Sequence, residues 1–145
     1  MKLSIIIPTY NEEKTILKIV ERVKKQKLPN KIDKEIIVVD DGSTDQSYSL
    51  LKGVNDIVLL RHETNKGKGF AIRTGLEKVT GDYVLVQDAD LELSPEDYPL
   101  LLQPVIEKNA KVVYGSRLLG KKWHDYNVFY YNGGKFVTFV ANILY

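Results

Sequence analysis

The chain has 145 residues, of which 43% are hydrophobic and 28% charged, a composition typical of a water-soluble globular domain. It has no cysteine, which excludes disulfides and thiolate metal sites. The 21 Lys and Arg residues nearly balance 19 Asp and Glu residues, and a net charge of +2 excludes a general nucleic-acid binder. The N-terminal apolar run is broken by Pro8, and no later run reaches the roughly 18 residues of a membrane span. We therefore expect a domain that is cytoplasmic or peripheral at a membrane.

Apolar segments of strand length alternate with segments of helical periodicity, which predicts an α/β fold with a mostly parallel sheet buried on both faces. Strands are expected at residues 3–7, 35–39, 57–61, 83–86 and 111–114. Helices are expected at about residues 12–25, after Asp45, at about residues 69–79 and from Ser94 onward. Asn11 is the expected N-cap of the first helix.

From Trp123 onward the sequence is rich in aromatic residues, and an apolar stripe recurs there at helical spacing. The stripe consists of Phe136, Phe139, Val140, Ile143 and Leu144. It fits either a helix packed on a core or an amphipathic helix in a membrane interface, beside Lys121 and Lys122. The chain stops there without a cap or closing turn, as if it were truncated within an element.

Carboxylates follow the predicted strands directly, at the edge where an open parallel sheet binds ligands. Asp88 and Asp90 follow the fourth strand, and side chains at i and i+2 of an extended segment project to the same side. A divalent cation would relieve their mutual repulsion, and hard oxygen ligands favour Mg²⁺ or Mn²⁺. Glu92 could supply a third oxygen. The alternative is a solvated acidic turn before the helix at Ser94.

Two further segments could contact a nucleotide. Asp40 and Asp41 end at the same predicted edge, where a carboxylate can accept from a base or a ribose and Tyr10 can lie against the base. A simple turn is the alternative, because Asp, Gly, Ser and Thr are ordinary turn formers. Residues 65–69 (NKGKG) form a glycine-rich segment that could bring N–H and ammonium groups near a phosphate, or could be a plain loop.

The two histidines, His62 and His124, have no carboxylate or cysteine neighbour at ligand spacing. We therefore expect both at the surface or in packing. Without cysteine, any metal in this chain must use oxygen or imidazole ligands.

Five segments, in this order, resemble the signature of family 2 glycosyltransferases with the GT-A fold. They are residues 5–13 (IIIPTYNEE), 38–45 (VVDDGSTD), 65–75 (NKGKGFAIRTG), 81–92 (GDYVLVQDADLE) and 112–117 (VVYGSR). Within this family the chain is similar to the dolichol-phosphate mannosyltransferases and related polyprenyl-phosphate sugar transferases. The resemblance implies a Rossmann-like, three-layer α/β/α fold with a mostly parallel central sheet.

The resemblance also implies roles for individual residues. Nucleotide-sugar binding is implied for Pro8, Tyr10, Glu12, Val39, Asp41, Lys68, Asp88, Ala89, Asp90 and Arg117. Asp88, Asp90 and Glu92 would hold Mg²⁺ or Mn²⁺ on the diphosphate. Asp90 and Arg117 would be catalytic, because the cation and the guanidinium neutralise charge that develops on the leaving phosphate.

The implied reaction is the inverting transfer of a sugar from a GDP- or UDP-sugar to a polyprenyl (dolichyl or undecaprenyl) phosphate at a cytoplasmic membrane face. Such an acceptor is largely ionised at neutral pH, whereas a sugar hydroxyl needs a positioned base. We expect residues 1–145 to form one catalytic domain, truncated before its acceptor-side segments, with Lys135 where relatives of this branch often have an additional arginine. Two alternatives are a transferase acting on a polysaccharide or other hydroxyl acceptor, and a non-catalytic nucleotide-binding module.

Overall fold

The computed structural model describes residues 1–115. Contacts divide the chain into two units, Met1–Lys111 and Val112–Tyr145, and the elements described below all lie in the first unit. The strands are β1 (Lys2–Thr9), β2 (Asp33–Asp40), β3 (Val58–Arg61) and β4 (Tyr83–Val86). The helices are α1 (Ile16–Lys25), α2 (Ser47–Leu51), α3 (Lys68–Leu76) and α4 (Tyr98–Lys108), with single 3-10 turns η1 (Pro29–Lys31) and η2 (Pro95–Asp97).

The four strands form one sheet in the order β3-β2-β1-β4, and every neighbouring pair is parallel. The predicted α/β class with a mostly parallel sheet is therefore confirmed. β1 pairs with β2 along its whole length, so Thr9 lies opposite Asp40. Because the strands are parallel, the carboxyl ends of β1, β2 and β4 reach the same edge of the sheet.

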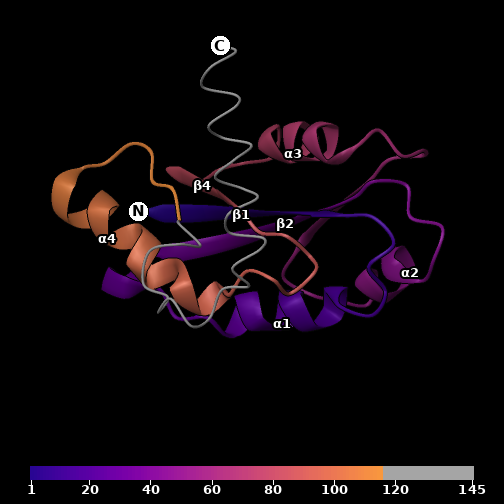
Figure 1. Ribbon diagram of the computed structural model, residues 1–145, viewed down its shortest axis with the longest axis horizontal. Helices are drawn as coiled ribbons and strands as arrows, with labels where there is room; N and C mark the ends of the chain where they lie inside the picture. Colours follow the sequence, from indigo (N-terminus) through magenta and orange to yellow (C-terminus); the bar gives the residue numbers. More distant parts are fainter. Residues whose placement is uncertain (116–145) are drawn as a thin grey trace, which may run out of the picture. The chain divides into compact units, whose positions relative to one another are not determined.

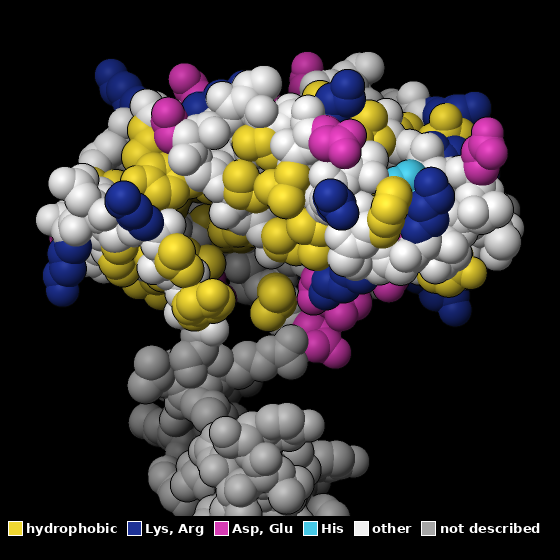
Figure 2. Space-filling view, turned by 90° about the horizontal axis from the view of Figure 1, so that it is seen from above, with side chains coloured by type: hydrophobic (Ala, Val, Ile, Leu, Met, Phe, Trp, Pro, Cys, Tyr) yellow, Lys and Arg dark blue, Asp and Glu magenta, His cyan; other side chains and the backbone are white. Residues whose placement is uncertain are grey.

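Helices cover both faces of this sheet, as predicted. Figure 1 shows α3 on one face and α1 and α4 on the other. β1 has seven consecutive buried residues, Leu3–Thr9, because both of its faces are covered. The larger core cluster includes residues of α1, α4 and one face of the sheet, and the smaller one consists of Ile6, Ile37, Val39 and Ala71. Figure 2, which views the α3 side, shows apolar side chains gathered on that face as well.

Helix α3 contacts the sheet closely at a glycine. A Cβ added at Gly75 would lie 2.7 Å from Cγ2 of Ile6 on β1. Ala71, one turn earlier, is also fully buried. These small residues allow α3 to approach the sheet, which fixes the position of its N-terminus at Lys68.

The first helix begins later than predicted, and Asn11 does not cap it. Helix α1 starts at Ile16, after a turn in which the Glu12 carbonyl accepts from the Thr15 and Ile16 N–H groups. Asn11 has a positive φ of 54°, and its Oδ1 accepts from the Thr44 N–H at 2.8 Å. The prediction was wrong because this side chain bonds to the loop after β2 rather than to its own helix.

No strand forms at residues 111–114, contrary to the prediction. Val112 and Tyr114 are 68% and 90% exposed. A strand requires a neighbour to pair its N–H and C=O groups, and within residues 1–115 none pairs with this segment. Arg117, His124, Lys135 and the apolar stripe from Phe136 to Leu144 lie outside the described residues. Among residues 1–115, no helix has the length and apolar character needed to cross a bilayer.

Candidate functional site

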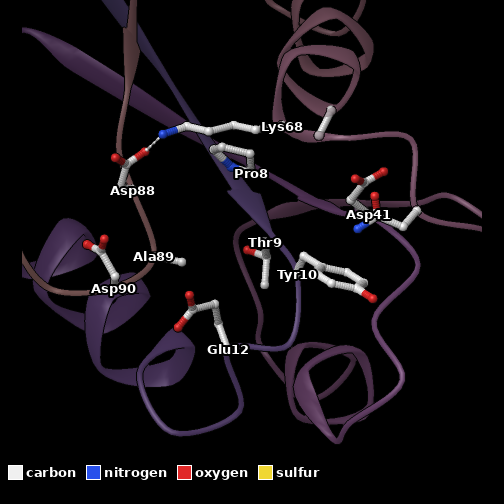
Figure 3. Close-up of a pocket in the computed structure, with 11 residues that line it drawn as sticks. Pro8, Thr9, Tyr10, Glu12, Asp41, Lys68, Asp88, Ala89 and Asp90 are labelled. Carbon is white, nitrogen blue, oxygen red and sulfur yellow. Dashed lines mark ion pairs between the residues drawn. The ribbon is translucent and has the colours of Figure 1, made fainter.

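A pocket of about 270 Å³ opens at the carboxyl ends of β1, β2 and β4, next to the N-terminus of α3. Its wall consists of Pro8, Thr9, Tyr10, Glu12, Asp41, Asn65, Lys68, Ala71, Asp88, Ala89 and Asp90. Most of the residues expected to bind a nucleotide sugar are therefore brought together (Figure 3). Figure 3 shows Asp88 and Asp90 on one side of the pocket, with Tyr10 and Asp41 on the other.

Some expected residues are not in this wall. Val39 is fully buried in the core cluster beside α3, and Asp40 is fully buried at the end of β2. Glu92 follows the wall residues, and its backbone N–H donates to Asp90 Oδ1 at 3.0 Å. Conversely, Thr9 and Ala71 line the wall although no role was predicted for them, and Asn65 belongs to the glycine-rich segment that was expected near a phosphate.

Asp41 is the most enclosed acidic residue of the wall, with 2% exposure. Its Oδ1 accepts from His62 Nδ1 at 2.6 Å and from the Lys66 N–H at 3.0 Å, and its Oδ2 accepts from the Gly67 N–H at 2.7 Å. Burial alone would raise the pKa of Asp41, but these hydrogen bonds outweigh it and lower the pKa below its ordinary value. Asp41 therefore fixes the loop that leads to Lys68.

His62 is buried and belongs to this network, which the sequence analysis missed. Its Nε2 lies 2.9 Å from the Thr74 hydroxyl of α3, while its Nδ1 faces Asp41. Spacing along the chain could not reveal the pair, because its members are 21 positions apart. The register of β2 and β3 could have revealed it. Asp40 lies opposite Arg61, so the next residues, Asp41 and His62, leave their strands side by side.

The loops after β1 and β2 are joined by hydrogen bonds. The Asn11 N–H donates to Ser43 Oγ at 3.0 Å, and the Glu13 N–H donates to Asp45 Oδ2 at 3.1 Å. Asp45 Oδ1 also accepts from the Ser47 N–H at 2.9 Å, at the start of α2. Burial opposes ionisation of Asp45, but these bonds lower its pKa. Tyr10, the first residue of the loop after β1, is 44% exposed and can offer its ring to a planar ligand.

On the opposite side of the pocket, Asp88 forms an ion pair with Lys68 of α3, with 2.6 Å between Oδ1 and Nζ (Figure 3). The two side chains are 24% and 59% exposed, so the pair is accessible to solvent and contributes little to stability. An ammonium group thus already occupies part of the position where a cation would meet this carboxylate. An anionic ligand could attract Lys68 and leave Asp88 free for a metal.

Asp88 and Asp90 fit an open site for a divalent cation, but not a closed one. Within residues 1–115 no three Asp, Glu or His side chains converge into a metal-binding group, so the structure does not assemble Asp88, Asp90 and Glu92 as a closed site. Two carboxylates beside an open pocket nevertheless suit Mg²⁺ or Mn²⁺, which use few protein ligands and complete their shell with phosphate oxygens. Asp88 and Asp90 are the residues of the wall that would hold such an ion.

Comparison with known proteins identifies the relatives of this chain. The family model described as "Glycosyl transferase family 2" matches residues 4–131. A UDP-N-acetylglucosamine–dolichyl-phosphate N-acetylglucosaminyltransferase of Methanococcus voltae is 34% identical, over 81% of this chain and 53% of that protein. A dolichol-phosphate mannosyltransferase of Pyrococcus furiosus is 32% identical, over 81% of this chain and 33% of that protein.

Solved structures agree with this assignment. The mannosyltransferase PcManGT from Pyrobaculum calidifontis, in complex with GDP-Man and Mn²⁺, superposes with a TM-score of 0.57. It is 31% identical, and the match covers 66% of this chain and 29% of that one. The chain thus spans about half or less of the length of the relatives it matches. The expected GT-A fold is confirmed.

Proposed function

Because the chain belongs to glycosyl transferase family 2, we propose that it supplies the donor-binding part of an enzyme that transfers a sugar from a nucleotide sugar to a polyprenyl phosphate. The observation that carries this proposal is the pocket at the carboxyl edge of the sheet, where two carboxylates and a lysine face an exposed tyrosine. Relatives named for transfer to dolichyl phosphate support the acceptor class.

In this proposal the donor lies across the pocket. Its base and ribose contact Tyr10, Pro8 and Glu12, with Asp41 at the inner end of that side. Its diphosphate lies toward Lys68 and the carboxylates of Asp88 and Asp90. The donor is a GDP- or UDP-sugar; GDP-Man in PcManGT and the UDP-sugar named for the Methanococcus relative support this class.

The reaction places negative charge on the leaving diphosphate. Mg²⁺ or Mn²⁺, when bound, supplies Lewis-acid stabilisation of that charge. Asp88 and Asp90 hold the ion, and the Lys68 ammonium binds the phosphates directly. Arg117, outside the described residues, is proposed to assist in the same way. A single displacement by an acceptor that is already ionised inverts the sugar carbon and needs no general base from this chain.

The acceptor class also bears on location. A polyprenyl phosphate is anchored in a bilayer, so we propose that the protein works at the cytoplasmic face of a membrane. We propose that residues 1–115 contact that membrane peripherally, as relatives named for dolichyl-phosphate acceptors suggest.

Calorimetry with Asp90→Asn tests the donor site. The unsubstituted chain is expected to bind UDP or GDP more tightly with Mn²⁺ than with EDTA, and Asp90→Asn to lose most of that difference while keeping its melting temperature. Asp56→Asn is the matched control, since this carboxylate is 87% exposed and has a positive φ that asparagine tolerates. Equal affinity with and without metal in the unsubstituted chain would contradict the proposed donor site.

A transfer assay tests the acceptor. A chain extended to the full length of its relatives is expected to form a lipid-linked sugar from a nucleotide sugar and a polyprenyl phosphate. Transfer only to a saccharide or other hydroxyl acceptor would contradict the polyprenyl phosphate acceptor and identify the alternative class of transferase. Nucleotide binding without transfer or hydrolysis would identify a non-catalytic module.

A further inference from the structure

Gln87 is a fully buried amide directly after β4, at the start of the loop that carries Asp88 and Asp90. It is 1% exposed, although glutamine is mostly found at protein surfaces. Its backbone N–H donates to the Ile6 carbonyl at 2.9 Å, which continues the pairing of β4 with β1. The side chain is therefore held in the core while the following residues turn toward the pocket.

The amide of Gln87 spans the loop from end to end. Its Nε2 donates to the carbonyl of Asp88 at 3.0 Å and to the carbonyl of Leu93 at 3.2 Å. Its Oε1 accepts from the hydroxyl of Tyr98 at 2.7 Å. Carbonyls can only accept, so the amide orientation is fixed and Tyr98 must donate. Burial raises the pKa of Tyr98, which keeps this donor protonated.

The remainder of the loop is fixed from outside. Arg22 of α1 donates to Ser94 Oγ at 2.9 Å and forms an ion pair with Glu96 at 2.5 Å. Ala89 is 5% exposed and belongs to the larger core cluster. Leu91 has a φ of 67°, a conformation that a leucine keeps only where its surroundings impose it. The loop is thus held by β4 at its start and by Arg22 at its end, and the Gln87 amide connects its first and last carbonyls.

We propose that Gln87 and Tyr98 are positioning residues for the metal-and-diphosphate side of the donor site. The Gln87 amide fixes the backbone from which Asp88 and Asp90 project, while Tyr98 holds the amide in place. The inference rests on the proposed function. Ligand groups must be placed to within about 0.5 Å to act together, so loosening this loop weakens metal-dependent binding. The base side is affected less, because Tyr10 and Asp41 lie on other loops.

Gln87→Leu in the full chain tests this inference. UDP and GDP affinities are measured by calorimetry with Mn²⁺ and with EDTA, and Mn²⁺ binding is followed by its electron paramagnetic resonance signal. Loss of a supporting hydrogen bond typically weakens metal binding by about tenfold or more, so we expect such a loss with Mn²⁺ and little change with EDTA. Gln103→Leu, on the exposed surface of α4, is the matched control and should change neither affinity.

A double variant separates positioning from stability. In Gln87→Leu the Tyr98 hydroxyl is left buried without its acceptor, and adding Tyr98→Phe removes that unsatisfied group. We expect the double variant to regain part of the lost melting temperature but not the metal-dependent affinity, because the Asp88 and Leu93 carbonyls remain unlinked. Affinity that recovers together with stability, or equal affinity in Gln87→Leu and the unsubstituted chain, would overturn this inference alone. Absence of metal-dependent binding in the unsubstituted chain would overturn the proposed function and this inference with it.

Discussion

Asp41 and Glu35 have lowered pKa values and lie at opposite ends of β2, where they make different contacts. Asp41 lies at the pocket and binds the loop before α3. Glu35, near the start of β2, accepts from the Ser4 hydroxyl and from the N–H and hydroxyl of Thr80, and pairs with Lys2 at 2.7 Å. Burial of Glu35 is outweighed by these partners, which lower its pKa to about 2. The first carboxylate fixes the wall of the pocket, whereas the second joins β1, β2 and the segment that leads into β4.

Glu35→Gln is expected to destabilise the fold in a pH-dependent way. The lowered pKa means that the stabilisation is fully present above the ordinary value of 4.5 and is lost as the pH falls toward about 2. At pH 7 we expect a loss of about 1–3 kcal/mol in the free energy of unfolding, from urea denaturation. The difference from the unsubstituted chain should narrow between pH 4.5 and 2. Glu77→Gln, at an exposed position, is the control, and a pH-independent difference would contradict this account.

Substitutions of His62 test the buried pair with Asp41. His62→Ala leaves a buried carboxylate with one partner fewer, and loss of a hydrogen bond to a charged group typically costs about 1.5–3 kcal/mol. His62→Asn should cost less, because its amide nitrogen can replace Nδ1 as the donor to Asp41. Chemical denaturation at pH 7 measures both, with Thr74→Val reporting the weaker bond at Nε2. Equal losses in the Ala and Asn variants would show that the Asp41 bond is not the stabilising contact.

At the scale of elements, α3 connects the core to the pocket. One end of this helix packs on β1 through Gly75, and the other end carries Lys68 into the wall. The loop before it donates to Asp41, and His62 contacts Thr74 near its C-terminal end, so the helix is fixed at both ends. Its position relative to the sheet therefore determines where Lys68 meets Asp88.

Two glycines of α3 provide a matched pair of substitutions. In Gly75→Ala the new Cβ would lie 2.7 Å from Ile6, and overpacking of this kind costs about 1–3 kcal/mol. In Gly69→Ala the new Cβ meets nothing within 4 Å, and alanine in a helix is favoured by up to about 1 kcal/mol. Thermal denaturation should therefore show opposite shifts, and Gly75→Ala should also weaken nucleotide binding. Shifts of the same sign would show that α3 does not pack as described.

At the scale of the molecule, the pocket joins segments that are distant in the sequence. Its wall takes residues from the ends of β1, β2 and β4 and from α3, so a bound ligand contacts most of the parallel sheet's loops at once. Each of these loops is held by a buried or half-buried side chain: Asp41, Asp45 or Gln87. Binding should therefore stabilise the domain as a whole.

Ligand-induced stabilisation measures this coupling. At a ligand concentration of 100 times Kd the folded state gains about 2.7 kcal/mol, which corresponds to a rise of roughly 5–10 °C in Tm for a domain of this size. We expect such a rise with UDP or GDP plus Mn²⁺, and a much smaller one when EDTA replaces the metal. Asp90→Asn should abolish the difference between the two conditions. A rise that is independent of metal would place the nucleotide elsewhere than against Asp88 and Asp90.

The sequence predicted what depends on local pattern and missed what depends on distant partners. Four strands were placed correctly because their apolar runs are continuous, as expected for a sheet covered on both faces. The start of α1 was misplaced because Asn11 bonds to residue 44. The segment at 111–114 has the composition of a strand but lacks a described partner.

The same distinction applies to the pocket. The wall residues in recognisable motifs, such as Tyr10 and Asp88, were predicted, because each follows a strand directly. The supporting side chains were not. His62 pairs with a carboxylate 21 positions away, and Gln87 meets a tyrosine across the loop that it closes. Such contacts become visible only when strand register and loop geometry are known.

The position of the wall residues along the chain has a consequence for protein synthesis. All the described wall residues lie between Pro8 and Asp90, and the side chain that closes the last loop, Tyr98, follows within ten positions. Chains fold from the N-terminus as they leave the ribosome, at about 5–20 residues per second. The pocket can therefore assemble within seconds of the emergence of α4, before the residues that follow α4 have emerged. With the donor site that we propose, a nascent chain would be able to bind a nucleotide sugar at that stage.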